Sequence, residues 1–501
     1  MAHEVVVVGG GIGGLTVAAL LAARGLDVCV LERQSRVGGC VAGFEKFGYT
    51  FDSGIGLYPL WQPDAIHDRV FSQLPVKPPE TRVHDPAYVV RLPDRSEVAL
   101  SGNIDQFEDS LRAVFPECAT SAIEFYRESE RVSNALMRAF QRIPDLQTAG
   151  RIKQFYSLLP HVLTAAQISS TKDQTVVRHL DGTSHRFRRF VDVQLQLLAQ
   201  SPGDECAYLY ATLALTLPRR QMFSIKGGSA ALAAALAESI KTSGGRVRLD
   251  TPVLRLAYDA SGRAIGVDLL SGETVRASRA IISNLTVWDT YGRLIGLSRT
   301  PPKIRNRLTT LRGWGAYVLY LGMDEAAAKR IPENNVLALT DWQEAQSFNP
   351  EDSQFMFAAA PAWDTRGPAG KRAVTVHTFT DVDDWFTFHE NEEQHEQKDQ
   401  SKLEECWNRL HLAMPELGAD LEVIDTATPQ TCYDLTRRRL GMVGGVGQSL
   451  AVFGPNSVGT ETSLPNVFMI GDTTFPGAGV AAVSYAALAL ANRLSARFST
   501  T

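Results

Sequence analysis

The sequence lacks several features that mark common classes of protein. It has no excess of positive charge, because the formal net charge is -5, and so it carries no basic field for nucleic acid. Its six cysteines include no Cys-x-x-Cys pair, which argues against a disulfide scaffold or a zinc site and suits a reducing compartment. Gly-x-Ser-x-Gly and His-Glu-x-x-His motifs are missing, so the corresponding hydrolases and metalloproteases are not indicated.

Long apolar runs are also missing. Even the stretch from Tyr208 to Leu217 is too short to span a bilayer. The N-terminus, Met1 to Glu4, is acidic, and the apolar run behind it breaks at glycines, as in a buried strand and unlike a signal peptide. We therefore expect a cytoplasmic protein that can still associate peripherally with a membrane surface.

The chain has 501 residues, of which 44% are hydrophobic, and this allows two to four domains with a large core. Glu4 to Val8 is a β-branched run typical of a strand that is buried on both faces. Leu15 to Arg24 is rich in Ala and Leu and predicts a helix that ends at Gly25. Asp27 to Leu31 then predicts a second strand, which completes a β-α-β unit.

Two further regions predict regular structure. Residues 246–283 read as several strands, with turn signals at 259–262 and 271–272. Asn466 to Ile470 predicts a last strand, which a glycine-rich turn joins to an Ala-rich helix over Val480 to Arg493. The long segments between these regions contain helix-like stretches, for example Ser121 to Phe140 and Lys402 to Leu412.

A nucleotide-binding motif follows the first strand directly. Its glycines, at spacing Gly-x-Gly-x-x-Gly, are Gly9, Gly11 and Gly14. In such a turn the first glycine permits the tight bend, the second admits a pyrophosphate, and the third lets helix and strand pack closely. Ile12 and Gly13 open the helix, whose N-terminus offers free N–H groups and a positive dipole end to the phosphates.

Glu32 ends the second predicted strand, eighteen positions after Gly14. A carboxylate there accepts hydrogen bonds from the ribose hydroxyls of an adenosine and disfavours a 2′-phosphate, and hence NADP. The alternative interpretation is an ordinary surface glutamate. Arg33 and Val253 complete our predicted cofactor contacts in this half of the chain.

Two stretches distinguish FAD from NAD by resemblance. Arg33 and Arg36 lead to Gly38-Gly39, which looks like the double-glycine motif of a large flavoprotein group. Near the C-terminus, 467–472 and 476–480 resemble the flavin-binding end of the same group. There the resemblance implies that Asp472, after Gly471, holds the ribityl chain, and that backbone N–H groups at Gly479 and Val480 face the flavin. No second fingerprint is present, so we expect FAD and no separate NAD(P)H domain.

The chain resembles the phytoene desaturase, carotenoid isomerase and retinol saturase family, which shares its fold with flavin amine oxidases. Four stretches carry the resemblance: 38–44 with 48–54, 223–229, 441–445, and 471–480 with Ser484-Tyr485. They cover the flavin-binding part well and the intervening segments poorly. Two departures stand out, since retinol saturases have a histidine where this chain has Gly56, and many desaturases have an arginine where it has Cys40.

This resemblance implies an α/β fold. It consists of a Rossmann-type, glutathione reductase-like FAD-binding domain with the double-glycine motif and an interleaved α+β substrate domain. We assign residues 1–60, 220–290 and 431–501 to the discontinuous FAD-binding domain. Residues 61–219 and 291–430 form the expected substrate domain.

The implied function is that of an FAD-dependent oxidoreductase acting on a lipophilic polyene, with carotenoid desaturation as the favoured activity. Cis–trans isomerisation and double-bond saturation remain open, as do a flavin amine oxidase and a flavin-binding or carotenoid-carrying protein without catalysis. A polyisoprenoid substrate would be taken from a membrane surface. The apolar segments 155–166 and 207–217 then either line the entry or are ordinary buried helices.

Individual side chains give weaker indications. Lys226 lies beside Gly227-Gly228, which the resemblance places near the flavin, and its side chain either acts there or points to water. Tyr208, Tyr210 and Tyr485 either line a substrate cleft or pack in the core. We expect no metal site: His389 and His395 are six residues apart and do not share a helix face. Asp383-Asp384 reads as a loop or cap and not as an acid/base pair.

Overall fold

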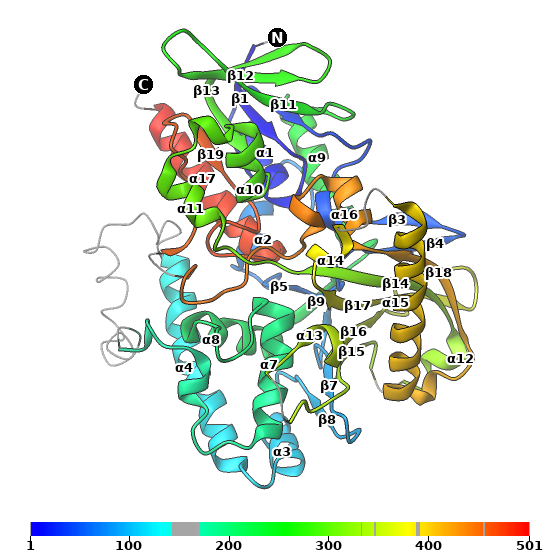
Figure 1. Cartoon of the computed structure of the whole chain (residues 1–501). Helices are drawn as coiled ribbons and strands as arrows, with labels where there is room; N and C mark the ends of the chain where they lie inside the picture. Colours follow the sequence, from blue (N-terminus) through cyan, green and yellow to red (C-terminus); the bar gives the residue numbers. More distant parts are fainter. Residues whose placement is uncertain are drawn as a thin grey trace.

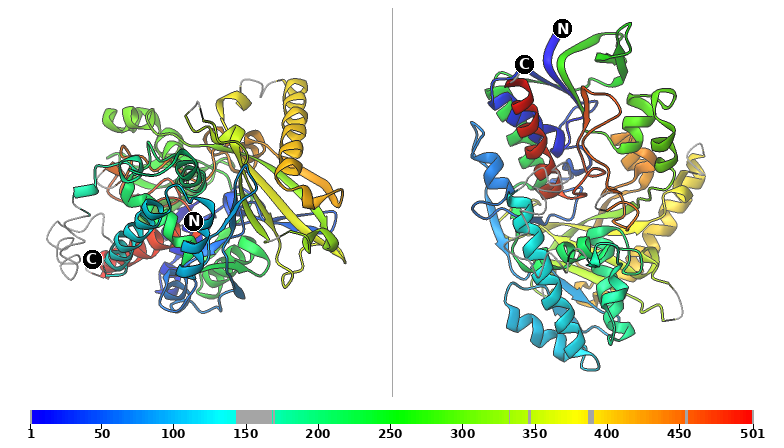
Figure 2. Two further views of the ribbon diagram at one scale, coloured as in Figure 1. Left: turned by 90° about the horizontal axis from the view of Figure 1, so that it is seen from below. Right: turned by 90° about the vertical axis from the view of Figure 1, so that its left-hand side faces the viewer.

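The computed structural model describes residues 2–142, 168, 170–331, 333–344, 347–386, 391–453 and 456–499. Both ends of the chain lie at the same end of the molecule, beside a sheet built from segments far apart in the sequence (Figure 1). A second sheet and a group of helices occupy the opposite end (Figures 1 and 2). None of the described helices combines the length and the apolarity that are needed to cross a bilayer.

The first sheet brings together seven described strands in the order β10-β2-β1-β13-β12-β11, with β19 also paired to β13. The strands are β1 (Ala2–Val8), β2 (Val28–Leu31), β10 (Arg246–Arg248), β11 (Val253–Tyr258), β12 (Ala264–Leu269), β13 (Thr274–Ser283) and β19 (Val467–Met469). The strands β10, β2, β1, β13 and β19 run parallel, whereas β11, β12 and the start of β13 pair antiparallel. This mixed arrangement confirms the Rossmann-type prediction, because the parallel strands direct their C-terminal ends to one edge.

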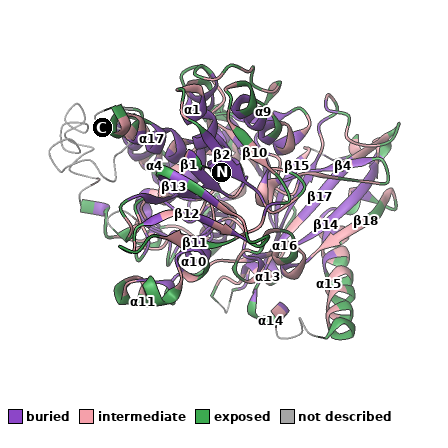
Figure 3. Cartoon of the chain, turned by 90° about the horizontal axis from the view of Figure 1, so that it is seen from above, coloured by how far each residue is buried: buried purple, intermediate pink, exposed green. Residues whose placement is uncertain are grey.

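Helix α1 (Ile12–Ala23) explains why the first predicted unit is so apolar. It packs between α9 (Gly228–Thr242) and α17 (Val480–Ser499), and Leu15 through Leu21 are buried. A helix that is buried all round has no polar face, and the strand beside it, β1, is likewise buried from Val5 to Val8 (Figure 3). The helix begins at Ile12, so the last glycines of the motif form its first turn, as the motif predicted, ahead of the Ala- and Leu-rich stretch from Leu15.

The second sheet is mostly antiparallel and has the strand order β18-β14-β17-β16-β15-β7-β8. Its strands are β7 (Val89–Arg91), β8 (Glu97–Ala99), β14 (Gly315–Asp324), β15 (Asn335–Leu339), β16 (Gln354–Ala359), β17 (Lys371–Thr380) and β18 (Leu421–Ala427). There are also two small sheets. One pairs β3 (Phe44–Lys46) with β4 (Tyr49–Phe51). In the other, β9 (Met222–Ile225) lies between β5 (Tyr58–Pro59) and β6 (Thr81–His84). The boundaries at 60, 219, 290 and 430 remain a proposal. The strands of the two large sheets divide along them, whereas the small sheet of β5, β9 and β6 crosses them.

Helices cover both faces of the second sheet. On one face, Leu337 and Met356 share a core with α3 (Ile104–Val114), α4 (Ala119–Arg142), α7 (His185–Ala199) and α8 (Tyr208–Thr216). On the other face, Cys406 and Leu410 of α15 (Glu392–Ala413) pack on Tyr317 and Val376. The segment 155–166, which we expected near a substrate entry, lies outside the described residues.

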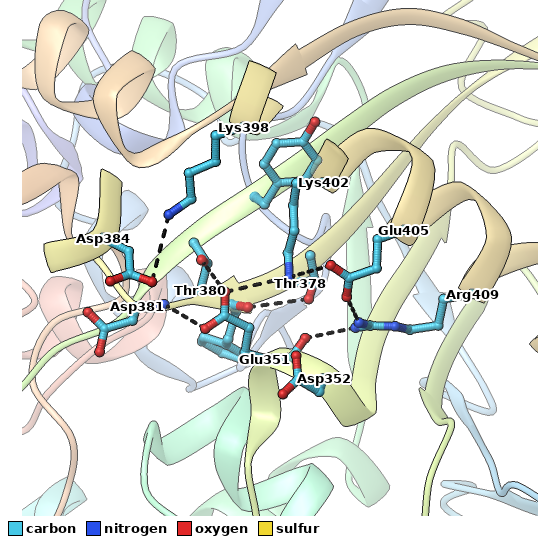
Figure 4. A network of polar contacts seen from close by, with 12 residues as sticks. Glu351, Asp352, Thr378, Thr380, Asp381, Asp384, Lys398, Lys402, Glu405 and Arg409 are labelled. Carbon is cyan, nitrogen blue, oxygen red and sulfur yellow. Dashed lines mark hydrogen bonds and ion pairs between the residues drawn. The ribbon is translucent and has the colours of Figure 1, made fainter. Parts of the chain in front are cut away.

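Polar contacts also hold α15 against this face of the sheet (Figure 4). Glu351, in α13 (Pro350–Ser353), accepts a hydrogen bond from the Thr380 hydroxyl group at 2.6 Å and lies 3.5 Å from the Lys402 ammonium group. The Arg409 guanidinium group donates to the Glu351 carbonyl oxygen at 2.8 Å and also pairs with Glu405. The network therefore explains why a helix with so few apolar residues is held against the sheet.

A buried ion network joins the two ends of the molecule. The Arg366 guanidinium group lies 2.8 Å from Asp52 Oδ2 and 2.6 Å from Asp364 Oδ2. Asp52 also accepts hydrogen bonds from the Ser229 N–H group at 2.9 Å and its hydroxyl group at 2.8 Å. Burial opposes the charge on Arg366, but the two carboxylates outweigh that effect and raise its pKa. The network connects the chain after β4, the start of α9 and a loop of the second sheet.

Gly228 is required by this network. A Cβ atom at Gly228 would overlap the carboxylate of Asp52, and the residue has a φ of +69°. The Gly227 N–H group donates to Asp364 at 3.0 Å, so the neighbouring glycine takes part as well. The glycine pair of the 223–229 stretch therefore serves the contact with Asp52 and Asp364, and neither glycine lines the main cleft.

We predict that Arg366→Met destabilises the protein by about 3–5 kcal/mol, because two buried carboxylates lose their counterion. The midpoint of thermal unfolding measures the effect. Lys226→Met is the matched control, since the Lys226 ammonium group is exposed and only pairs with Glu80 at 3.0 Å. A wild-type midpoint for Arg366→Met would show that the network does not hold the parts together.

Candidate active site

A large cleft of about 980 Å³ lies between the two sheets. One half is lined by the glycine-rich turns and strand ends of the first sheet. Of the predicted cofactor contacts, those that line this half are Gly9, Gly11, Ile12, Gly13, Glu32, Arg33, Gly38, Gly39, Val253, Gly471, Asp472, Gly479 and Val480. Gly14 is the exception, and it lies beneath the cleft.

The glycine motif forms a turn that only glycines permit. Gly9 has a φ of +99°, which is in the left-handed region. A Cβ atom at Gly11 would lie 2.7 Å from the Asn284 amide nitrogen, and one at Gly14 would overlap the Gly9 carbonyl oxygen. The double glycine packs on the same turn, because the Gly38 N–H group donates to the Gly10 carbonyl oxygen at 2.8 Å. The N-terminus of α1 is thus left open toward the cleft.

Glu32 is buried at the end of β2 and is not a surface residue. Its Oε2 atom accepts a hydrogen bond from the Gly10 N–H group at 2.6 Å, and its Oε1 atom accepts one from the Gln34 N–H group at 2.8 Å. These backbone bonds fix the orientation of the carboxylate at the edge of the cleft. It is thereby placed to meet the hydroxyl groups of a ribose.

The C-terminal part of the site centres on Asp472. Arg438, which follows α16 (Pro429–Thr436), holds this carboxylate with two N–H groups, at 2.9 and 3.3 Å. Burial opposes the charge of Arg438, but Asp472 together with Cys40 and Cys432 outweighs that effect and raises the arginine's pKa. A Cβ atom at Gly445 would overlap the Asp472 carbonyl oxygen, whereas Cβ atoms at Gly441 and Gly444 would overlap the Pro429 carbonyl oxygen and the Gln200 side chain.

The other half of the cleft is apolar. Its walls come from three helices and from one face of the second sheet. The residues are Met137 and Phe140 of α4, Leu197 and Leu198 of α7, Tyr210, Leu213 and Ala214 of α8, and Ala316, Val318, Tyr320, Leu337 and Met356 of the sheet. The expected segment 207–217 therefore contributes to this wall. No lysine lines the cleft anywhere in the described part of the chain.

His377 is a polar residue on this face that was not identified from the sequence. It lies on β17 opposite Val318 and Met356, and these three residues all line the cleft. Burial lowers its pKa to about 4, so the imidazole is neutral at physiological pH. The ring bonds to the backbone of Gly54, whereas its Nε2 atom has no partner among the described residues. The sequence feature that could have identified His377 is a histidine within the β-branched run 371–380.

Asn284 and Arg438 were also missed. Asn284 follows β13, and its side chain packs against Gly11, Gly13 and Gly14. Its only sequence signal was its position after an apolar strand. Arg438 stands in a run of three arginines, 437–439, and nothing in that run distinguishes it.

Four further side chains were candidates for the site, namely Lys226 and three tyrosines, and only two of the tyrosines line the cleft. The Lys226 side chain is exposed and paired with Glu80, which favours the interpretation that it points to water. Tyr210 and Tyr485 line the cleft, whereas Tyr208 stacks on His179 with ring centroids 3.5 Å apart.

Of the groups considered for metal binding or acid/base chemistry, those that the structure describes do not line the cleft. The His395 ring contacts Trp385, and His389 lies outside the described residues. Asp384, in α14 (Asp383–Phe386), lies 3.8 Å from the Lys398 ammonium group. Among the described residues no cluster of three His, Cys, Asp or Glu side chains is arranged to hold a metal.

These features fit FAD. The cleft offers the free N-terminus of α1 for a pyrophosphate, a fixed carboxylate at each end of the nucleotide half, and an adjoining apolar space. The family model described as "Flavin containing amine oxidoreductase" matches residues 12–487. The chain belongs to this family. It is an FAD-dependent oxidoreductase.

Curated relatives span nearly the whole chain. It is 24% identical to a chloroplastic prolycopene isomerase of Daucus carota, over 99% of this chain and 80% of the relative. It is 25% identical to an all-trans-retinol 13,14-reductase of Danio rerio, over 93% and 82%. It is 27% identical to a zeta-carotene-forming phytoene desaturase of Myxococcus xanthus, over 98% and 94%. The predicted family of desaturases, isomerases and saturases is therefore confirmed.

Solved structures show the same fold. One is cyclohexylamine oxidase from Brevibacterium oxydans, which matches with a TM-score of 0.62 at 16% identity, over 98% of this chain and 99% of that one. At this identity the likeness concerns the architecture alone.

We predict that purified protein contains FAD in roughly equal molar amount and that Gly11→Val abolishes this occupancy. The added side chain would collide with Asn284 and fill the space that a pyrophosphate needs. The ratio of flavin to protein absorbance measures occupancy. Gly292→Ala is the control, because a Cβ atom there meets nothing within 4 Å. Full FAD occupancy in Gly11→Val would contradict the placement of the cofactor.

Proposed function

We propose that the protein desaturates a lipophilic polyene of the carotenoid type. The observation that carries this proposal is the apolar half of the cleft, which continues directly from the nucleotide half. Among the described residues, the carboxylates that line the cleft belong to Glu32, Asp64, Asp289 and Asp472, and none of these lies on the apolar walls. A hydrocarbon fits such a wall, whereas a cationic amine would lose its hydration without gaining a charged partner there.

The names of the relatives support the same class of substrate, since prolycopene, retinol and phytoene are all polyenes. Flavin amine oxidase chemistry remains the second candidate, because Tyr210 and Phe453 form an aromatic pair in the cleft with centroids 5.8 Å apart. Peroxide release from amines would distinguish this activity from polyene chemistry.

Desaturation requires a group that takes up a proton. Bound FAD supplies the two-electron acceptor for the C–H bond that is broken. The neighbouring carbon then loses a proton as the new double bond forms, and we assign the Nε2 atom of His377 to receive it. Its neutral imidazole and its missing hydrogen-bond partner suit that role, and Gly54 orients the ring. The apolar walls orient the polyene and exclude water.

The mass of the product tests the reaction. A poly-cis carotene is incubated with the oxidised and then with the pre-reduced protein. We expect loss of two hydrogens with the oxidised form. An unchanged mass with altered absorption would instead indicate isomerisation, and a gain of two hydrogens saturation. His377→Phe should lower turnover by about 10²-fold while polyene binding persists, and Lys226→Ala should leave turnover unchanged. If no polyene reacts, the proposal fails.

We further infer that the protein takes its substrate from a membrane surface as a peripheral, cytoplasmic protein. The reason is physical, because a polyene of this size is nearly insoluble in water. We expect co-sedimentation with liposomes loaded with carotenoid. Protein that remains in the supernatant with loaded and empty liposomes alike would contradict this inference.

A further inference from the structure

A small polar cavity of about 40 Å³ lies behind the wall of the main cleft. The residues of segment 54–56 line both spaces and therefore lie between them. Two strands also lead from the cleft to the cavity. On β17, His377 lines the cleft, and Thr375, which is on the same face of the strand, lines the cavity; on β9, Met222 and Ser224 do the same.

The cavity has the size and the chemical character to hold water. One water molecule requires about 10–15 Å³ of such space, so about two or three fit. Ser224 is 2% exposed, and its hydroxyl group has no hydrogen-bond partner among the described residues. Because buried polar groups in proteins are paired with protein or with water, this hydroxyl group indicates a bound water molecule. His84, which is half-buried and thus nearer to solvent than Ser224, lines the same cavity.

His377 needs a route by which its proton can leave. Burial lowers its pKa to about 4, although the contact with Gly54 and the negative charge of Asp52 both act to raise it. At neutral pH the protonated ring therefore favours loss of its proton by a factor of about 10³. A hydrocarbon in the apolar half of the cleft excludes water from the Nε2 side of the ring. The ring's other contact is with the backbone of Gly54, and the cavity lies behind that segment.

We propose that water in this cavity carries the proton from His377 to solvent. The inference rests on the proposed function, in which Nε2 receives a proton from the substrate. The protonated ring gives one proton to this water, which passes one on to solvent, so that the ring is neutral again. Exchange of the remaining N–H proton with the same water then frees Nε2 for the next turnover. Ser224 is a positioning residue, because its hydroxyl group can both donate to the water and accept from it.

The test is a single turnover without oxygen, in weakly buffered solution, of oxidised holoprotein mixed with the polyene. Bleaching of the flavin reports that the C–H bond is broken, and a pH indicator dye reports the release of the proton. We expect the wild type to release about one proton for each flavin reduced, at the rate of bleaching. Ser224→Val replaces the hydroxyl group by methyl groups that fill the cavity. Its flavin should bleach at the wild-type rate, because His377 starts out neutral, whereas proton release should be at least about 10-fold slower.

Ser224→Ala removes the hydroxyl group but leaves the space, and it covers the case in which Ser224→Val does not fold. Its proton release should be about 3-fold slower than bleaching, since the water loses one hydrogen bond. Ser239→Ala is the matched control. Ser239, in α9, is also fully buried with a hydroxyl group that has no partner among the described residues, but it lines neither the cleft nor the cavity. Both of its rates should equal those of the wild type.

Proton release that keeps pace with bleaching in Ser224→Val, or in Ser224→Ala if Ser224→Val does not fold, would overturn this inference and leave the polyene chemistry intact. If no polyene bleaches the flavin, the proposed function fails and this inference fails with it. A second readout needs neither cofactor nor substrate. A crystal structure of the protein should show ordered water beside the Ser224 hydroxyl group, and a dry cavity would also overturn the inference.

Discussion

The buried contact between Arg366 and the carboxylates of Asp52 and Asp364 is the constraint on which the rest of the structure depends. It is the point at which the chain after β4, the start of α9 and the second sheet meet. Buried charges are tolerated only when each has its partner, so the network admits one relative placement of these segments. That placement leaves the cleft between the sheets, with the nucleotide half on one side and the apolar half on the other.

Local pattern was sufficient to predict the first sheet and its nucleotide turn. The β-branched run of β1, the glycine spacing and Glu32 all act within a short stretch of chain, where sterics and hydrogen bonding are set by neighbours. Gly227 and Gly228 were misinterpreted because their role does not depend on neighbouring residues. Their glycine character was clear in the sequence, but its cause is the carboxylate of Asp52, 176 positions before Gly228. A contact between residues so far apart in the sequence produces no periodic pattern and no local motif from which it could be predicted.

His377 and Arg438 show the same limit within the site. Each is an ordinary residue in its own segment, a histidine in a strand and the second of three arginines. Their chemical character arises only when other segments surround them, His377 by burial beside Gly54 and Arg438 by burial beside Asp472 and Cys40. Sequence motifs identify groups that work through backbone geometry. Side chains whose chemistry depends on burial can be identified only from the assembled fold.

The relatives of this chain include an isomerase, a reductase and a desaturase on one scaffold, and the structure offers a physical reason. The nucleotide half offers the site for the cofactor, and the apolar half can hold a lipophilic ligand by shape and hydrophobic burial, which are insensitive to the direction of electron flow. Direction then depends on whether the flavin arrives oxidised or reduced and on where protons can be held. On the apolar wall the described residues provide one imidazole, which burial keeps neutral and makes a weaker base. The wall alone therefore does not select a direction, and the redox state of the flavin does.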